Sequence, residues 1–440
     1  MSKRIVITGL LLLFIFAVSA QKKLSYIEVD KKSYELTQQQ KWDELIEFST
    51  EVRKQGMDFF YLQARTGIAY YNLKKYRIAS DWFLKAWEND QSFEWLQEYL
   101  YYSLLYAGRV TEATKLSNNF ARGLQSRIGF AESKLTRLAV EGGYSYNPDF
   151  DQLVNSFLGD DADVGFNYGE AFFLKNYHFE SFDLSHQVLP GFNLNHNFTF
   201  LTSNREQQID WGSHNSFAIK VNQYQYFLNP HFILGKKVYV SPSFSVLWGS
   251  SNIVMGDYEP NSFYTSEIKF SDFIFSTAVW SHFGNFSPGA EINFANIYDE
   301  SFTQFSAWLT VYPLSNTNLY FTPRVYLRTD SEGNINYNTF GISGGAQLGP
   351  VHFYGQYLVG DMKNFIEASG YVISNFPGTS TRKITSSLYF PKGKKYQFVI
   401  RYINQDVTEK YQVYINQEPN NSVEYNFIKH TITGGISWNF

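Results

Sequence analysis

The sequence predicts an α plus membrane-β fold, in which a helical N-terminal domain precedes an antiparallel outer-membrane β-barrel. Three observations predict it: an N-terminal secretory signal, a change from helical to two-residue periodicity near residue 137, and a strictly alternating C-terminal strand. Composition agrees. A mean hydropathy of -0.30 is too polar for a helical membrane protein, whereas 19% aromatic residues would supply the aromatic girdles of a barrel.

The first 20 residues have the pattern of a secretory signal peptide. Lys3 and Arg4 form a basic segment, residues 5–18 form an apolar one, and Ala20 ends a small-residue cleavage site. The alternative is a short membrane anchor, but the apolar run is below the roughly 20 residues that a spanning helix needs. We therefore exclude residues 1–20 from the fold. The chain has no cysteine, which excludes a disulfide framework and a cysteine nucleophile.

Residues 25–136 carry helical patterning that repeats along the chain. Trp42, Tyr76 and Val110 recur at a spacing of about 34 residues, the length of a tetratricopeptide helix-turn-helix unit. The middle unit resembles that repeat family most, with small residues where helices approach and aromatic residues between them: Gly67, Tyr70, Ala79, Phe83 and Ala86. The alternative is an unrelated helical bundle whose aromatic residues form an ordinary core.

From residue 137 to residue 440, two-residue alternation replaces the helical period. In the last strand, apolar residues ending with Trp438 and Phe440 point one way, and polar residues ending with Asn439 point the other. Many such segments in a row favour a membrane barrel over a soluble sandwich. The terminal aromatic residue resembles the signal that the bacterial barrel-assembly machinery reads, with Trp438 and Phe440 facing lipid.

The alternating runs predict about 16 strands, because bacterial single-chain barrels have an even number. Polar segments at 148–166, 202–215 and 249–262 have the composition of external loops. Residues 405–424 leave two possibilities open, one long loop or a short strand with two turns. An even strand number puts both ends of the barrel on the periplasmic side, so we expect the helical domain in the periplasm.

The polar faces of the strands predict the lining of the lumen. An arginine facing lipid at the midplane would cost roughly 2–4 kcal/mol, so we expect the strand arginines to point inward. The predicted lumen-lining residues are Glu291, Tyr320, Arg324, Tyr326, Arg328, His352, Gln356 and Arg401. Planar hydrogen-bonding groups and rings suit a saccharide, while a polar lumen is also what any barrel requires.

No enzyme motif is found, and we expect no enzyme activity, no cofactor and no metal site. Ser185 beside His186 leaves a lipid-modifying barrel enzyme as an alternative, because such enzymes carry serine and histidine on neighbouring strands. A formal net charge of -4, from 37 basic and 41 acidic residues, predicts no polyanion-binding surface. Nucleic acid is therefore not an expected partner.

The architecture from about residue 25 to residue 440 resembles the outer-membrane exporters of bacterial exopolysaccharides and the YaiO-like barrel family. The resemblance rests on the repeat-like middle unit and on the C-terminal barrel. It implies passage of a saccharide polymer through the barrel, with the helical repeats binding periplasmic protein partners. The alternative from a different class is a structural or assembly barrel whose repeats recruit proteins.

Overall fold

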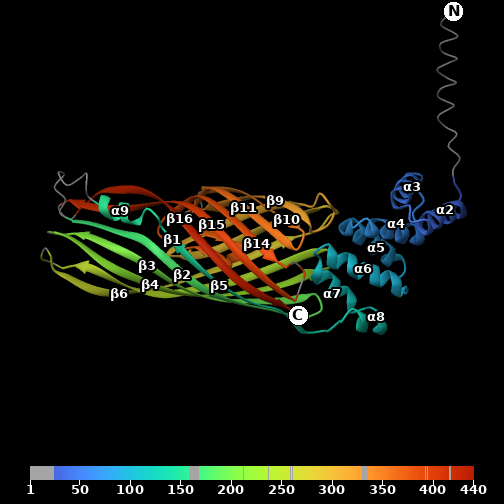
Figure 1. Cartoon of the computed structure of the whole chain (residues 1–440), viewed down its shortest axis with the longest axis horizontal. Helices are drawn as coiled ribbons and strands as arrows, with labels where there is room; N and C mark the ends of the chain where they lie inside the picture. The colour runs from blue at the N-terminus through green and yellow to red at the C-terminus, as the bar shows by residue number, and fades with distance from the viewer. Residues whose placement is uncertain are drawn as a thin grey trace, which may run out of the picture. The chain divides into compact units, whose positions relative to one another are not determined.

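The computed structural model describes residues 24–157, 168–211, 213–235, 237–257, 259, 261–329, 335–391, 393, 395–415 and 418–440. The chain divides into two compact units, Met1–Ala107 and Gly108–Phe440 (Figure 1). The predicted signal peptide lies outside the described residues. Within the described ranges, no helix combines the length and the apolar character needed to cross a membrane.

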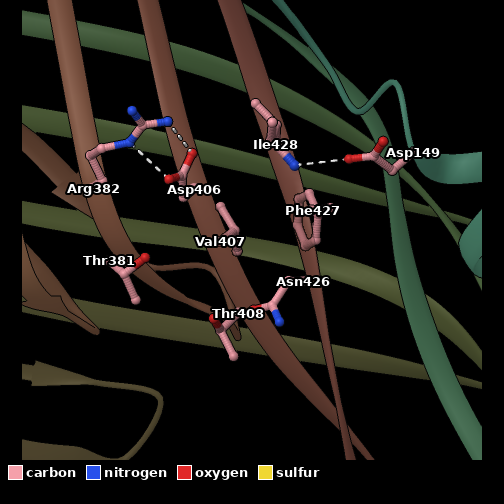
Figure 2. A pocket seen from close by; sticks show the side chains of 9 residues that line it. All are labelled: Asp149, Thr381, Arg382, Asp406, Val407, Thr408, Asn426, Phe427 and Ile428. Carbon is pink, nitrogen blue, oxygen red and sulfur yellow. Dashed lines mark hydrogen bonds and ion pairs between the residues drawn. The ribbon is translucent and has the colours of Figure 1, made fainter.

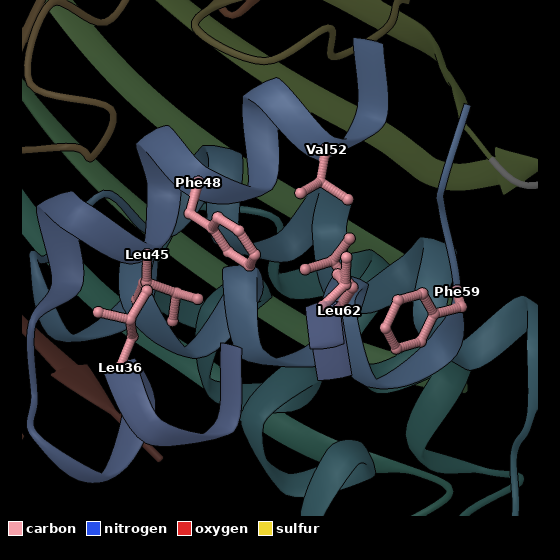
Figure 3. Packing of buried hydrophobic residues seen from close by; sticks show 8 residues of the cluster. Leu36, Leu45, Phe48, Val52, Phe59 and Leu62 are labelled. Atoms are coloured by element: carbon pink, nitrogen blue, oxygen red, sulfur yellow. The ribbon is translucent and has the colours of Figure 1, made fainter. Parts of the chain in front are cut away.

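The described part of the first unit is helical. Ser25 and Glu28 start its first helix with a capping box, in which each side chain accepts a hydrogen bond from the other residue's backbone N–H. Residues from the first three helices form a shared apolar core, shown in Figure 3. The helices are α2 (Tyr26–Gln38), α3 (Trp42–Lys54), α4 (Phe60–Asn72), α5 (Tyr76–Asn89) and α6 (Glu94–Tyr106).

The packing of α4 against α5 depends on small residues. A Cβ atom added at Gly67 would lie 2.6 Å from the ring of Phe83, so only glycine allows this approach without a shift of the ring. Ala79, Phe83 and Ala86 of α5 are fully buried, and Tyr70 is half-buried. The repeat-packing residues singled out in the sequence therefore lie in or beside one helix–helix contact.

The strands of the second unit close into an antiparallel barrel of 14 strands, in which β1 pairs with β16. Their bounds are β1 (Lys134–Tyr146), β2 (Tyr168–Leu189), β3 (Phe192–Asp210), β4 (His214–Leu234), β5 (Val238–Gly256), β6 (Phe263–Trp280), β7 (Phe286–Ile297), β8 (Glu300–Val311), β9 (Leu319–Thr329), β10 (Ile335–Leu348), β11 (Val351–Met362), β14 (Thr379–Phe390), β15 (Tyr396–Ile415) and β16 (Glu418–Asn439). Figure 1 shows them side by side in one wall.

The prediction of about 16 strands is wrong, since the barrel has 14. The predicted loops were also too long, because polar composition does not end a strand. Most of the segment 202–215 extends β3 and β4, and the first part of 249–262 extends β5. In the segment 405–424, the described residues form neither predicted alternative, since β15 extends to Ile415 and β16 begins at Glu418, and the two strands pair with each other. Strand pairing uses backbone groups, so the sheet continues with polar side chains beyond the apolar band.

Alternation along each strand separates an apolar outer face from a polar inner face. On β16, Ile428 and Ile432 are exposed, whereas Lys429 and Thr431 between them are buried. Closure of the sheet also leaves no unpaired strand edge facing hydrocarbon. The second unit is thus built as a membrane-spanning β-barrel.

The C-terminal strand closes the wall against β1. Trp438 lies opposite Leu138 on one side and Tyr396 on the other. The backbone N–H of Phe440 donates to the carbonyl oxygen of Thr136 at 3.0 Å, and 56% of Phe440 is exposed. The last residue is therefore bonded through its backbone while its ring stays on the surface.

Two short helices, α7 (Val110–Ser117) and α8 (Arg122–Arg127), precede β1 within the second unit. The carboxylate of Glu112 pairs with Arg109 at 2.8 Å, and both side chains are buried. The hydroxyl of Tyr239 donates to the same carboxylate at 2.9 Å, and the Lys115 ammonium donates to the carbonyl oxygens of Ile233 and Gly235. These bonds hold α7 on the ends of β4 and β5.

Asp58, between α3 and α4, gives the helical unit a pH-dependent stability. Burial acts to raise the pKa of this carboxyl, but hydrogen bonds from Lys85 and Gln63 and the charges of Lys85 and Arg53 outweigh it, so its pKa is lowered. A carboxyl with a depressed folded-state pKa contributes stability above its unfolded pKa and loses it as pH falls through the folded value.

We therefore expect Asp58→Asn to lower the helical melting temperature at pH 7 and to flatten its dependence on pH in the acid range. Circular dichroism at 222 nm on the whole protein, from pH 7 to pH 3, measures both effects. Glu47→Gln, at an exposed position of α3, is the control. Equal acid sensitivity of Asp58→Asn and the unsubstituted protein would contradict the assignment.

Candidate functional site: the barrel lumen and its internal loop

The connection between β11 and β14, residues 363–378, lies inside the barrel; we call it the internal loop. It contains β12 (Phe365–Glu367), the 3₁₀ helix η2 (Ala368–Gly370) and β13 (Val372–Ser374), and β12 pairs with β13 as a separate sheet. A segment that contacts inward-facing side chains all around a closed wall must occupy the lumen. Those wall residues are Asp183, Asn197, Gln225, Ser243, Ser245, Glu291, Gln304, Tyr326, Arg328, Gln356, Lys383 and Lys429.

The turn of the internal loop is bound through its backbone carbonyl groups. The hydroxyls of Ser243 and Ser245 on β5 donate to the carbonyl oxygens of Ser369 and Gly370, each at 2.6 Å. Gln225 on β4 donates to the carbonyl oxygen of Gly370 at 3.2 Å. Buried carbonyl groups that would otherwise lack partners are satisfied by the wall.

Two further contacts fix the loop to opposite sides of the barrel. The amide of Gln304 on β8 donates to the carbonyl oxygen of Ile366 at 2.7 Å and accepts from its N–H at 3.2 Å. The hydroxyl of Tyr371 donates to the carboxylate of Asp183 on β2 at 3.1 Å, and its ring lies edge-on to Phe227. The loop therefore bridges the lumen from wall to wall.

Apolar contacts are local and fewer. Ile366 packs with buried residues of β5 to β8, among them Leu247, Ile274 and Phe302. Phe365 lies against the ring of Tyr326 at a centroid distance of 4.8 Å. On another part of the wall, Phe376 packs against Leu174, Val407 and Phe427. The loop thus combines apolar contacts at separate places with hydrogen bonds and ion pairs to the wall.

The loop backbone is strained at its bends. Asn364, Ala368 and Ser369 adopt left-handed conformations, with φ of 48°, 50° and 59°. Such a conformation costs a residue other than glycine roughly 1–2 kcal/mol, so it persists only where surrounding contacts impose it. The contacts described above supply that constraint.

Four of the eight predicted lumen residues contact the internal loop. Glu291 accepts from the hydroxyl of Ser369 at 2.7 Å, and Tyr326 packs on Phe365 as described. Arg328 donates to the carbonyl oxygen of Lys363, and Gln356 donates to the carboxylate of Glu367 at 3.2 Å. The structure brings these residues together around a segment that the sequence analysis did not place in the lumen.

The other four lie elsewhere on the polar face. Arg401 pairs with the carboxylate of Glu141. The guanidinium of Arg324 lies over the ring of Trp308, 4.1 Å from its centroid. Tyr320 and His352 stack on each other with centroids 6.0 Å apart.

The loop left a signal in the sequence that alternation alone did not capture. Asn364, Ser369, Gly370, Pro377 and Gly378 place turn-forming residues close together. Such spacing leaves no room for another membrane strand, which needs about 9–11 residues. Whether the loop folds into the lumen or away from it depends on contacts with strands that are distant in the sequence. No local sequence pattern predicts this.

The side chains of the candidate serine–histidine pair diverge. Ser185 and His186 are consecutive residues of β2, so they point to opposite faces of the wall. His186 instead stacks on His196 with centroids 5.5 Å apart. In the described part of the chain, no group of three or more acidic, histidine or cysteine residues could hold a metal ion.

A separate cavity of about 390 Å³ lies on β14, β15 and β16, where β1 no longer covers β16 (Figure 2). Arg382 and Asp406 form a bidentate ion pair beside it, with both N–O distances 2.8 Å. The N–H of Ile428 donates to the carboxylate of Asp149 at 3.1 Å. The carboxylate of Asp149 therefore supplies a hydrogen-bond partner to the backbone of β16 beyond the part that β1 pairs with.

Apolar outer wall, polar lumen and internal loop together define a β-barrel of the outer-membrane type. No family model matches the sequence, and no curated protein matches it. Solved structures do. A Pseudomonas aeruginosa FadL homologue is 7% identical, with a TM-score of 0.43, over 74% of this chain and 94% of its own. The Pseudomonas putida toluene transporter TodX is 8% identical, with a TM-score of 0.44, over 71% of this chain and 91% of its own.

The translocator domain of the autotransporter NalP from Neisseria meningitidis is 10% identical, with a TM-score of 0.29, over 77% of this chain and 99% of its own. The predicted resemblance to tetratricopeptide-containing exopolysaccharide exporters and YaiO-like barrels is wrong, because the similar solved structures are FadL-type and TodX barrels instead. The features behind it, helix spacing and strand alternation, recur in unrelated proteins. The expectation that a saccharide polymer passes through the barrel rested on this resemblance and is no longer supported.

Replacing Gln304 by Leu should loosen the internal loop without unfolding the barrel. The change leaves the N–H and carbonyl of Ile366 without their wall partner, at about 1–3 kcal/mol for each buried group. Hydrogen exchange at Ile366, measured by mass spectrometry in detergent, should become at least about tenfold faster. Asn296→Leu, which removes a bond to Ser301 of β8, is the control and should leave loop exchange unchanged.

Proposed function

We propose that the protein is an outer-membrane transport barrel whose lumen is closed by the internal loop in this state and opens when the loop moves. The observation that carries the proposal is the loop itself, a segment held across the lumen by hydrogen bonds to strands on opposite sides. The lumen is closed by one connection between strands and not by the wall itself. The passage can therefore open or close while the wall stays intact.

Barrel size supports this proposal. About eight strands give an interior that side chains alone can fill, and diameter grows with strand number. A barrel of 14 strands encloses more space, so its closure needs an additional element. A barrel that serves only as an anchor has no need for the larger interior.

The chemistry of the contact between loop and wall also supports it. Most of the bonds join polar groups, such as Ser245 with Gly370 and Tyr371 with Asp183. When such groups separate in a hydrated lumen, water replaces the lost partners, so the net cost of each bond is only about 0.5–1.5 kcal/mol. An apolar plug would lose its whole buried area instead.

The helical unit supports a second role, the binding of periplasmic proteins. The second residue of each of three helices is large, apolar and exposed. These residues are Ile27 of α2, Tyr61 of α4 and Trp95 of α6, with exposed fractions of 80%, 46% and 37%, respectively. Large apolar side chains at equivalent exposed positions form a repeated surface feature suited to a protein partner. The chain enters the barrel at the end with short turns, such as that between β2 and β3, which is periplasmic in barrels of this type.

Photo-crosslinking tests the partner role. A photoreactive residue in place of Tyr61 should form crosslinks to periplasmic proteins in intact cells, because its side chain is exposed on α4. The same residue in place of Glu47, exposed on α3, is the control. Equal labelling from both positions, or labelling from neither, would refute a partner surface on α2, α4 and α6.

Bilayer recordings test the transport role. A variant with residues 365–374 replaced by a short glycine–serine linker should give large, stable current steps, whereas the unchanged protein should conduct little. Shortening 257–262, which bonds to the neighbouring connection at Trp211, is the matched control and should leave conductance low. Heat-dependent migration on gels verifies assembly of each variant. An assembled loop-shortened barrel that stays silent would overturn the transport proposal.

A further inference from the structure

A row of three polar residues crosses neighbouring strands on the inner face of the barrel. Lys383 of β14 lies opposite Gln405 of β15, which lies opposite Lys429 of β16. All three are buried and belong to the inward-facing set of their strands. Since adjacent strands are about 4.8 Å apart, the row places two ammonium-bearing side chains roughly 10 Å apart with an amide between them.

The internal loop covers both ends of this row with different groups. At one end, the carboxylate of Glu367 pairs with Lys383 and also accepts from Gln356. At the other end, the ring of Phe376 lies over Lys429, with the ammonium 4.0 Å from its centroid. The loop therefore supplies an anion to one lysine and an aromatic face to the other.

Lys429 differs from other cations of the lumen. Arg401 pairs with Glu141, and Arg328 pairs with Glu300. Lys429 is only 4% exposed, yet in the described ranges its ammonium makes no hydrogen bond or ion pair. It lies over the rings of Phe376 and Tyr177, and the carboxylate of Glu409 acts on it only through its charge, without a direct contact. A buried ammonium that no carboxylate contacts directly is costly, so the position favours a negatively charged partner.

The surroundings of Lys429 offer further donors. The hydroxyl of Tyr177 lies 3.3 Å from that of Thr431, which donates to the hydroxyl of Ser145 at 3.0 Å. Hydroxyls of this kind can turn to donate to an oxyanion. The row and its neighbours thus combine two ammonium groups, one amide and several hydroxyls on one patch of the lumen wall.

We propose that Lys383, Gln405 and Lys429 form a binding site for the carboxylate or phosphate group of an anionic molecule that passes through the barrel. The carboxylate of Glu367 occupies the Lys383 end in the closed state, as an internal stand-in for that group. An incoming anion competes with Glu367 and weakens one attachment of the loop. This inference rests on the proposed transport function and names the chemical class of its substrate.

Direct binding in detergent tests the site without requiring conduction. Glu367→Gln removes the internal anion, so it should bind inorganic phosphate or acetate at least about tenfold more tightly than the unchanged protein in calorimetric titrations. Adding Lys383→Met and Lys429→Met should abolish that binding. Adding Lys410→Met instead, which removes an exposed lysine of β15 that pairs with Glu424 of β16, is the matched control and should leave the binding of Glu367→Gln unchanged.

The two probes separate the sources of the charge. Preference for phosphate assigns the site to phosphate groups, and preference for acetate assigns it to carboxylates. If Glu367→Gln fails to assemble, the loop-shortened barrel, which also lacks Glu367, takes its place in the same titration. Absence of binding by an assembled barrel with both lysines present overturns the site.

Ion selectivity gives an independent measurement in the loop-shortened barrel. Under a KCl gradient, its reversal potential should lie toward chloride, and Lys383→Met with Lys429→Met should move it toward potassium, while Lys410→Met leaves it unchanged. A conducting channel whose selectivity ignores the two lysines would overturn the anion site and leave the transport function standing. An assembled barrel that does not conduct but still binds phosphate would overturn the transport function and leave the anion site standing.

Discussion

The need to pair every backbone N–H and C=O group in hydrocarbon is the constraint on which the rest of this structure depends. In lipid, a sheet meets it only by closing on itself. Closure through β1 and β16 in turn fixes an inner and an outer face on every strand. The outer face takes the apolar residues, and the polar ones are left to find partners inside. The composition of the lumen is thus a result of the closure.

An enclosed polar lumen creates a second requirement, because buried charges and amides need partners of their own. Neighbouring strands satisfy part of it, as Glu141 does for Arg401. The internal loop satisfies much of the rest, with Glu367 for Lys383 and the backbone of Ile366 for Gln304. The same segment therefore spans the lumen and neutralises part of its wall, and the proposed gating and the proposed anion site both rest on it.

Local periodicity made the fold class accessible from sequence, whereas the site required contacts between distant residues. The last strand, from Ile428 to Phe440, alternates strictly and closes the barrel as part of β16. The strand ends were misplaced because polar strand ends, such as 202–210, have the composition of loops. The position of the internal loop inside the lumen was missed because the contacts that hold it there are non-local. Tyr371 and Asp183, for example, are separated by 188 positions. The overall resemblance to exporters failed for a related reason, since it rested on patterns that many folds share.

The attachment of α7 has a mechanical consequence. Lys115 is bonded to the turn after β4, and Glu112 is bonded to Tyr239 and Arg109 in a buried group. A pulling force on the chain before Gly108 is therefore borne by these bonds before it reaches β1. Each hydrogen bond from α7 to the barrel involves a charged group and contributes about 1.5–3 kcal/mol, so the closing strand is shielded from tension that a loose linker would transmit directly.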